Sequence, residues 1–180
     1  LRNLIYKNYV TEGVGFNPVT EAWINFLLER GYGPAREVEA IGVENFENED
    51  TAAATYHNGK AILAASKNIN EWASRVADAY GLTGPEGIKF VKEFIWRHEL
   101  FHVLDRRKGV SKDKTEAELG KLLAEFYEEV AQTGKPGHAK YYRALRDFNR
   151  WYAAEYREGR ESQESLLSTS NLEALVNNYA

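Results

Sequence analysis

The stretch Trp96-Arg97-His98-Glu99-Leu100-Phe101-His102 contains the pattern H-E-x-x-H inside an apolar run whose spacing predicts a helix. On a helix, residues four positions apart lie on the same face, one turn from each other. His98 and His102 can therefore offer two imidazole nitrogens to one metal ion, and Glu99 lies within reach of a water on that metal. The pattern is typical of zinc hydrolases, in which the two His are metal ligands and the Glu is the general base.

Length and composition predict one globular domain. The chain has 180 residues, of which 43% are hydrophobic and 28% are charged, which suits a packed core. The net charge of −4 argues against a nucleic-acid partner. Because the sequence has no apolar run of membrane-spanning length and no signal-peptide pattern, we expect a cytoplasmic protein with no membrane partner. The absence of Cys excludes disulfides and Cys-ligated zinc.

The order of patterns along the chain predicts an α+β fold. We expect a mostly helical domain with a small antiparallel sheet packed on the helix that carries the motif. The range Thr51–Ser66 predicts a β-hairpin, because Asn58-Gly59 is the strongest short turn signal. A further strand is expected at Glu37–Val43. Residues 1–158 are assigned to a single catalytic domain, and residues 159–180 to a C-terminal tail.

Helical periodicity and capping residues predict the remaining elements. The motif helix begins near Thr83, has Pro85 in its first turn and is expected to stop at Gly109. Ser111 can cap the next helix, so the two helices are predicted to form a tight αα-hairpin. The breaker Gly134–Gly137 ends that second helix. Other helices are expected at Thr20–Arg30, with Thr20 as its cap, at Asn68–Tyr80, and at His138–Tyr156.

A catalytic zinc usually has three protein ligands, so the His pair needs a partner. In the metzincin pattern a third His ligand follows six residues after the second, but Lys108 occupies that position here. Because Cys is absent, a carboxylate from the following helix remains. His102 lies six residues, or roughly 9 Å along the helix axis, before the predicted end of its helix. On the returning helix, Glu116 lies roughly 7.5 Å and Glu118 roughly 10.5 Å from Ser111, so both lie near the level of a metal bound to His102.

Helical phase ranks these two candidates. Glu116 lies on a flank of the buried face, one turn below Gly120 and two turns below Ala124, and these small residues would let the motif helix approach closely. Glu118 lies on the opposite flank among other acidic residues, which is typical of a solvated strip. We therefore choose Glu116 as the third ligand and keep Glu118 as the second choice.

The order hairpin, helix, His98-Glu99-Leu100-Phe101-His102 helix and Glu helix resembles the gluzincin group of zinc metallopeptidases. Glu116-Ala117-Glu118-Leu119-Gly120 is similar to the downstream Glu helix of that group. The small size resembles the minigluzincins, and ImmA-type peptidases are similar around the motif helix. The resemblance covers about Thr51 to Thr133. It implies a zincin-like fold, Zn²⁺ as the cofactor, and a peptide or protein substrate that pairs with the strand Ala61–Ala65.

The function expected from this resemblance is zinc-dependent hydrolysis of peptide bonds. Glu99 would take a proton from a metal-activated water and pass it to the leaving amine. A donor that stabilises the oxyanion is expected among His138, Tyr141 and Tyr142, just after the breaker. The alternative is a zincin-like binding or regulatory protein without catalysis, or a latent form in which the tail from Gly159 covers the cleft.

Overall fold

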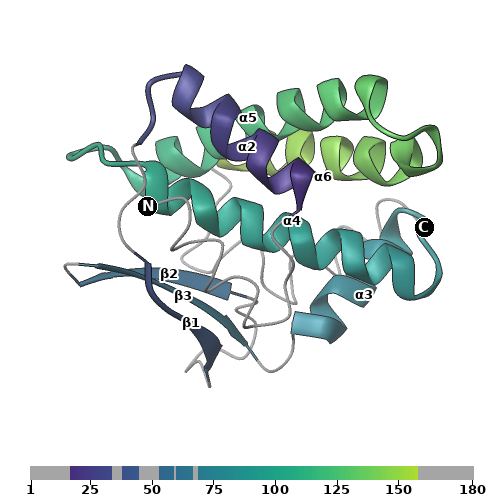
Figure 1. Ribbon diagram of the computed structural model, residues 1–180, viewed down its shortest axis with the longest axis horizontal. Coiled ribbons are helices and arrows are strands. Elements are labelled where there is room, and N and C mark those ends of the chain that lie inside the picture. The colour runs from purple at the N-terminus through teal and green to yellow at the C-terminus, as the bar shows by residue number, and fades with distance from the viewer. Residues whose placement is uncertain (1–16, 34–37, 45–52, 59, 67–68, 158–180) are drawn as a thin grey trace.

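The computed structural model describes residues 17–33, 38–44, 53–58, 60–66 and 69–157, and within the strands it places the side chain of Thr55 alone. The predicted tail at 159–180 and Asn68, the predicted start of the next helix, lie outside the described residues. Figure 1 shows the arrangement of the elements. In chain order they are α2 (Pro18–Glu29), β1 (Val38–Glu44), β2 (Ala53–Asn58), β3 (Lys60–Ser66), α3 (Ile69–Ala79), α4 (Gly84–Leu104), α5 (Lys112–Thr133), the 3-10 helix η1 (Pro136–His138) and α6 (Ala139–Arg157).

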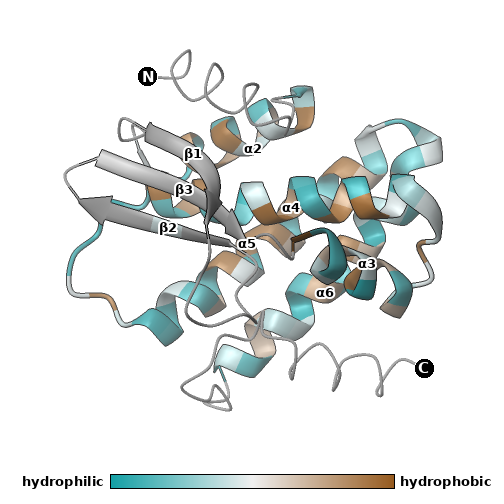
Figure 2. Ribbon diagram, turned by 90° about the horizontal axis from the view of Figure 1, so that it is seen from below, coloured by the Kyte–Doolittle hydropathy of each residue, from teal (hydrophilic) through white to brown (hydrophobic). Residues whose placement is uncertain are grey.

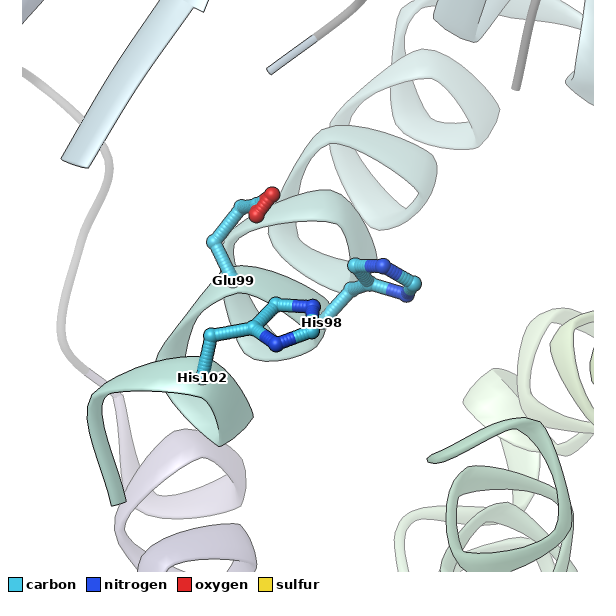
Figure 3. Close-up of side chains that lie close together, drawn as sticks. All are labelled: His98, Glu99 and His102. Atoms are coloured by element: carbon cyan, nitrogen blue, oxygen red, sulfur yellow. The ribbon is translucent and has the colours of Figure 1, made fainter. Parts of the chain in front are cut away.

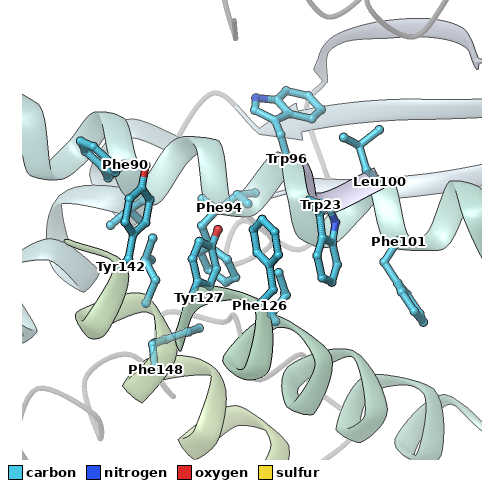
Figure 4. Packing of buried hydrophobic residues seen from close by; sticks show 14 of the residues in the cluster. Trp23, Phe90, Phe94, Trp96, Leu100, Phe101, Phe126, Tyr127, Tyr142 and Phe148 are labelled. Carbon is cyan, nitrogen blue, oxygen red and sulfur yellow. The ribbon is translucent and has the colours of Figure 1, made fainter. Parts of the chain in front are cut away.

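Helix α4, which carries the motif, lies at the centre of the domain. In Figure 1 the helices α2, α5 and α6 lie on one side of it, and the strands lie on the other. From Phe90 to Leu104 nearly every residue is buried, whichever face of the helix it lies on, so this part of α4 is enclosed on all sides. Aromatic rings from three further helices pack against it, as Figure 4 shows for Trp23, Phe126, Tyr127 and Phe148. The motif is therefore held by packed, rigid elements.

The predicted α+β fold class with an antiparallel sheet is wrong. Of the residues whose side chains are placed, 82% are helical, so the packing is that of a helical bundle. The buried apolar cluster comes from helices α2 to α6, with Leu82 added from the α3–α4 turn. The three short strands are also not an antiparallel set, because β3 lies between β1 and β2 and pairs in parallel with β1 (Figure 2).

The parallel neighbour of β3 explains why the sheet differs from the expectation. A tight turn brings together only the two strands that flank it, and β2 does pair with β3 in antiparallel fashion, from Ala53↔Ala65 to Asn58↔Lys60. Strand β1 joins the other edge of β3, from Val38↔Ala61 to Glu44↔Ser66. No local turn pattern encodes that pairing, because it joins segments that are distant along the chain.

Helices α5 and α6 pack side by side along most of their length. Gly120 of α5 makes this close approach possible. A Cβ added there would lie 3.0 Å from the Ala153 Cβ and 3.0 Å from the backbone oxygen of Asn149, both on α6. The expectation that Gly120 faces the motif helix is therefore wrong, since the small residue admits α6 instead.

The ends of the helices follow the capping residues, with two differences from the sequence prediction. Ser111 caps α5 as predicted, with its hydroxyl accepting from the Lys114 N–H at 3.2 Å. The cap of α2 is Asn17 rather than Thr20, because Asn17 Oδ1 accepts from the Thr20 N–H at 3.0 Å.

Helix α4 ends at Leu104, short of the predicted stop at Gly109. The Asp105 carboxylate accepts from the backbone N–H of Arg107 at 3.2 Å and from its Nε at 2.8 Å. The chain after α2 also reaches this end, where Gly33 N–H donates to the Leu104 carbonyl at 2.8 Å. These bonds compete with continuation of the helix, so the link to α5 runs from Asp105 to Ser111 and is longer than the predicted tight turn.

The residue before the first His of the motif is a fully buried arginine. Arg97 is 0% exposed, and its guanidinium donates to Thr20 Oγ1 and Asn17 Oδ1 of the α2 segment and to the Tyr127 hydroxyl of α5. A buried charge of this kind is tolerated because its donors are hydrogen-bonded. In the described part of the chain, no helix is both long enough and apolar enough to cross a membrane.

Candidate metal centre

The two motif histidines face one carboxylate of the next helix. His98 Nε2 lies 3.3 Å from Glu116 Oε2, and His102 Nε2 lies 3.2 Å from Glu116 Oε1. His98 and Glu116 are 3% and 7% exposed, whereas the His102 side chain is 21% exposed, so water can reach this meeting point only on the His102 side. The structure thus brings together the two His and the Glu that the sequence analysis chose.

The spacing of these donors fits a metal ion. At metal–donor distances of about 2.0–2.2 Å, two ligands of a tetrahedral zinc ion lie about 3.4 Å apart. The two N···O distances of 3.3 and 3.2 Å are close to that value. Two imidazoles and one carboxylate are also a donor set that suits zinc. The donor set and these two distances are therefore compatible with a zinc ion bound by His98, His102 and Glu116.

A second carboxylate, that of Glu99, competes for the third position. His98, Glu99 and His102 hold potential ligand atoms within 4.8 Å of one another, and Figure 3 shows the three side chains on adjacent turns of α4. Glu116 differs from Glu99 in that each of its two carboxylate oxygens faces one imidazole, at 3.3 and 3.2 Å, whereas Glu99 has a different partner. The Thr55 hydroxyl of β2 lies 3.2 Å from Glu99 Oε2 and 3.2 Å from the Glu99 carbonyl oxygen.

The charges at this point reinforce one another. Burial alone would lower the pKa of His102, but the hydrogen bond to Glu116 and the charges of Glu116, Glu99 and Asp105 raise it to about 9. Burial alone would raise the pKa of Glu116, but the charge of His98 and the hydrogen bonds from both imidazoles hold it well below its usual range. These shifts favour an ionised Glu116 and a protonated His102 in the metal-free protein, so His102 would have to release a proton in order to bind a metal.

A third helix also reaches Glu116. The Tyr152 hydroxyl of α6 donates to Glu116 Oε2 at 2.7 Å, and the Tyr152 side chain is buried. Burial and the charge of Glu116 raise the pKa of Tyr152 well above its usual value, so the phenol keeps its proton and donates. Sequence reasoning missed this residue, because one Tyr among 11 in the chain carries no local signal.

Glu118, the second choice for the third ligand, points elsewhere. Its carboxylate accepts from the Tyr32 hydroxyl and from Arg107 Nη1, the latter at 2.7 Å. Burial alone would raise the pKa of Glu118, but these two hydrogen bonds lower it below its usual value. Glu118 thus belongs to the junction of the α2 end with the α4–α5 link, and it is a natural control for Glu116.

The predicted catalytic residues Tyr141 and His138 do not reach the metal centre. The Tyr141 ring stacks on Phe90 at 4.4 Å between centroids, and the His138 ring lies 5.1 Å from the same Phe90. Phe90 precedes His98 by eight positions, which is a rise of roughly 12 Å along α4. Tyr142 also packs on Phe90, at 5.4 Å. All three lie at or just before the N-terminal end of α6, because they directly follow the breaker Gly134–Gly137.

Comparisons with known proteins do not assign this chain to a family. The chain matches no protein-family model, no curated protein sequence and no solved structure. The resemblance to gluzincins therefore stays a prediction from the motif residues. A function can therefore be inferred only from the arrangement of His98, His102, Glu116 and Glu99.

Proposed function

We propose that this chain is a zinc-dependent peptide hydrolase of the gluzincin type. His98, His102 and Glu116 would hold the metal, and Glu99 would act as the general base. The observation that carries the proposal is the buried Glu116 carboxylate, which faces both imidazole Nε2 atoms at 3.3 and 3.2 Å. An ordinary buried ion pair needs one partner for a carboxylate, whereas two imidazoles from consecutive turns converge on this one.

The chemistry follows from where the side chains lie. When bound, zinc supplies a Lewis acid that polarises a carbonyl and lowers the pKa of water. Glu99, with its carboxylate held beside Thr55, accepts a proton from the attacking water and returns it to the leaving amine. The water oxygen bonds to the peptide carbon and the C–N bond breaks, so the products are a carboxylic acid and an amine.

The strand proposed to bind the substrate changes from β3 to β2. The resemblance implied pairing along Ala61–Ala65, but this part of β3 is paired with β1 on one edge and β2 on the other. Among the described strands, β2 has β3 as its one neighbour, and β2 is also the strand that contacts Glu99 through Thr55. An extended peptide that adds to the outer edge of β2 would lie next to the proposed general base.

Metal content tests the proposed centre. We expect one zinc ion per chain in the purified wild type and in Glu118→Ala, and its loss in Glu116→Ala. Glu118 is a matched control, because it lies on the same helix and its carboxylate is directed at Tyr32 and Arg107. Elemental analysis of the three proteins gives the answer. Zinc that stays in both variants would remove Glu116 from the site, and a wild type that binds no zinc would overturn the proposal.

Cleavage of a quenched-fluorescent peptide library tests the activity of the same preparations. We expect Glu99→Gln to keep its zinc and to lose about 10²–10⁴-fold in cleavage rate, since it removes the base but not a ligand. A zinc-loaded Glu99→Gln variant that cleaves as fast as the wild type would contradict the role of Glu99. A zinc-loaded wild type that cleaves nothing would favour a binding protein built on the same site.

A further inference from the structure

The proposed metal centre has an outer support that sequence patterns do not reveal. We propose that Tyr152 is a positioning residue that holds Glu116 and His98 in place from the third helix, α6. This role rests on the proposed function, because it assumes that Glu116 and His98 are metal ligands. The hydroxyl of Tyr152 donates to Glu116 Oε2 at 2.7 Å, and its ring packs edge-on against the His98 ring at 5.6 Å between centroids.

The hydrogen bond restricts how the Glu116 carboxylate can turn. An ionised carboxylate accepts only, and a phenol that donates to one of its oxygens fixes the plane in which the other can face a metal. Tyr152 is 2% exposed, so a water molecule cannot easily take the place of its hydroxyl. Outer partners of this kind typically change metal affinity by 10–100-fold when they are removed.

The ring contact with Tyr152 helps to hold His98, which lacks, within the described part of the chain, the hydrogen bond that usually fixes a metal-binding imidazole. A metal-binding His usually donates from its second ring nitrogen to an acceptor that fixes the ring. His98 Nδ1 is buried and has no hydrogen-bond partner among the described residues. The ring of His98 is instead packed edge-on against Phe94 of its own helix and Tyr152 of α6. Tyr152 therefore contacts two ligands that come from two different helices.

The close packing of α5 and α6 brings Tyr152 to this position. Gly120 lies one turn after Glu116 on α5, and Ala153 follows Tyr152 on α6. Because Gly120 has no side chain, Ala153 approaches its backbone to a distance that any Cβ would obstruct. The hydroxyl of the neighbouring Tyr152 then reaches Glu116 directly.

Zinc affinity, measured by competition with a chromophoric chelator, tests this role. We expect Tyr152→Phe, which keeps the ring and loses the hydroxyl, to bind zinc about 10–100-fold more weakly than the wild type. Tyr152→Leu, which also loses the ring contact with His98, should bind more weakly still. The control is Tyr142→Phe, because this buried α6 tyrosine packs on Phe90 far from the ligands. Its zinc affinity should equal that of the wild type.

Two further readouts separate positioning from general stability. In a Glu116→Ala background, Tyr152→Phe should cause no further loss of the remaining zinc affinity, because the hydroxyl then has no ligand to hold. The visible spectrum of the cobalt-substituted protein should change in Tyr152→Phe and not in Tyr142→Phe. Equal zinc affinities for wild type and a folded Tyr152→Phe variant would overturn the role.

The outcomes distinguish this role from the proposed activity. A chain that binds zinc through Glu116, weakens in Tyr152→Phe and cleaves no peptide would keep the role of Tyr152 and overturn the hydrolase proposal. A wild type that binds no zinc would overturn both. A zinc-binding, peptide-cleaving wild type whose affinity is insensitive to Tyr152→Phe would overturn the positioning role alone.

Discussion

At the scale of single residues, the link between Thr55 and Glu99 separates the two carboxylates of the centre. Glu99 and Glu116 are both nearly buried, yet one is turned toward a strand hydroxyl and the other toward two imidazoles. A general base and a metal ligand need different surroundings, because the base must exchange a proton while the ligand must stay ionised. The Thr55 hydroxyl, 3.2 Å from Glu99 Oε2, therefore gives the proposed general base a partner that Glu116 does not share.

Thr55→Val should reduce catalysis without removing the metal. The variant keeps the shape of the side chain and deletes a hydrogen bond to a charged group, which is worth about 1.5–3 kcal/mol. If about half of that is expressed in the transition state, kcat falls by about 4- to 13-fold. Steady-state kinetics and zinc analysis of the variant check this. Thr133→Val is the control, because its hydroxyl donates to the Glu129 carbonyl at the exposed end of α5. An unchanged kcat in Thr55→Val would contradict the assignment.

At the scale of elements, the packing of α5 on α6 brings Tyr152 to Glu116. Gly120→Ala gains about 1 kcal/mol in helix propensity. It also places a Cβ 3.0 Å from backbone atoms of Asn149 and Ala153, which cannot move aside as a flexible side chain would. Such overpacking typically costs about 1–3 kcal/mol, so the contact outweighs the propensity.

We therefore expect Gly120→Ala to lower the free energy of unfolding by about 1 kcal/mol, as measured by urea denaturation of the zinc-free protein. Gly137→Ala is the matched control, because an added Cβ there meets nothing within 4 Å. A stabilised Gly120→Ala variant would show that the two helices separate easily, which would also weaken the argument for Tyr152.

The elements that the sequence predicted are those encoded by neighbouring residues. Ser111, Gly134 and the four-residue spacing of His98 and His102 are local signals, and each lies where the prediction placed it. The selection of Glu116 used rise and phase on two consecutive helices, which is still nearly local information. Tyr152 could not be found in this way, because its place depends on the packing of α6 on α5. The parallel pairing of β1 with β3 escaped prediction for the same reason.

At the scale of the whole molecule, the buried tyrosines make the fold sensitive to alkali. Burial raises the pKa of Tyr127 and of Tyr142 above the usual value of 10.0. The unfolded chain loses these phenol protons near pH 10, whereas the folded chain keeps them. Their contribution to stability is therefore fully present below pH 10 and is lost as the pH rises toward the folded-state values.

Above about pH 10, each such tyrosine should lower the free energy of unfolding by up to about 1.4 kcal/mol per pH unit. We expect the urea midpoint of the wild type to fall between pH 9 and pH 11, and to fall less in Tyr142→Phe. The control is Trp151→Phe, which alters a half-buried ring of the same helix that does not titrate. Parallel pH profiles for wild type and Tyr142→Phe would contradict the expectation.

Helix α4 lies between a helical half, formed by α2, α5 and α6, and a half formed by the strands. The proposed metal binding and the proposed peptide binding belong to different halves. The proposed ligands and their support come from α4, α5 and α6, whereas the contact to Glu99 comes from β2, an outer strand among the described strands. If the proposed function holds, a change in the helical half would alter metal binding first and catalysis only as a result. A change along β2 can alter which peptide is accepted while the metal stays in place. Selection for a new substrate would thus act on the strands, and the helices could remain as they are through many generations of such change.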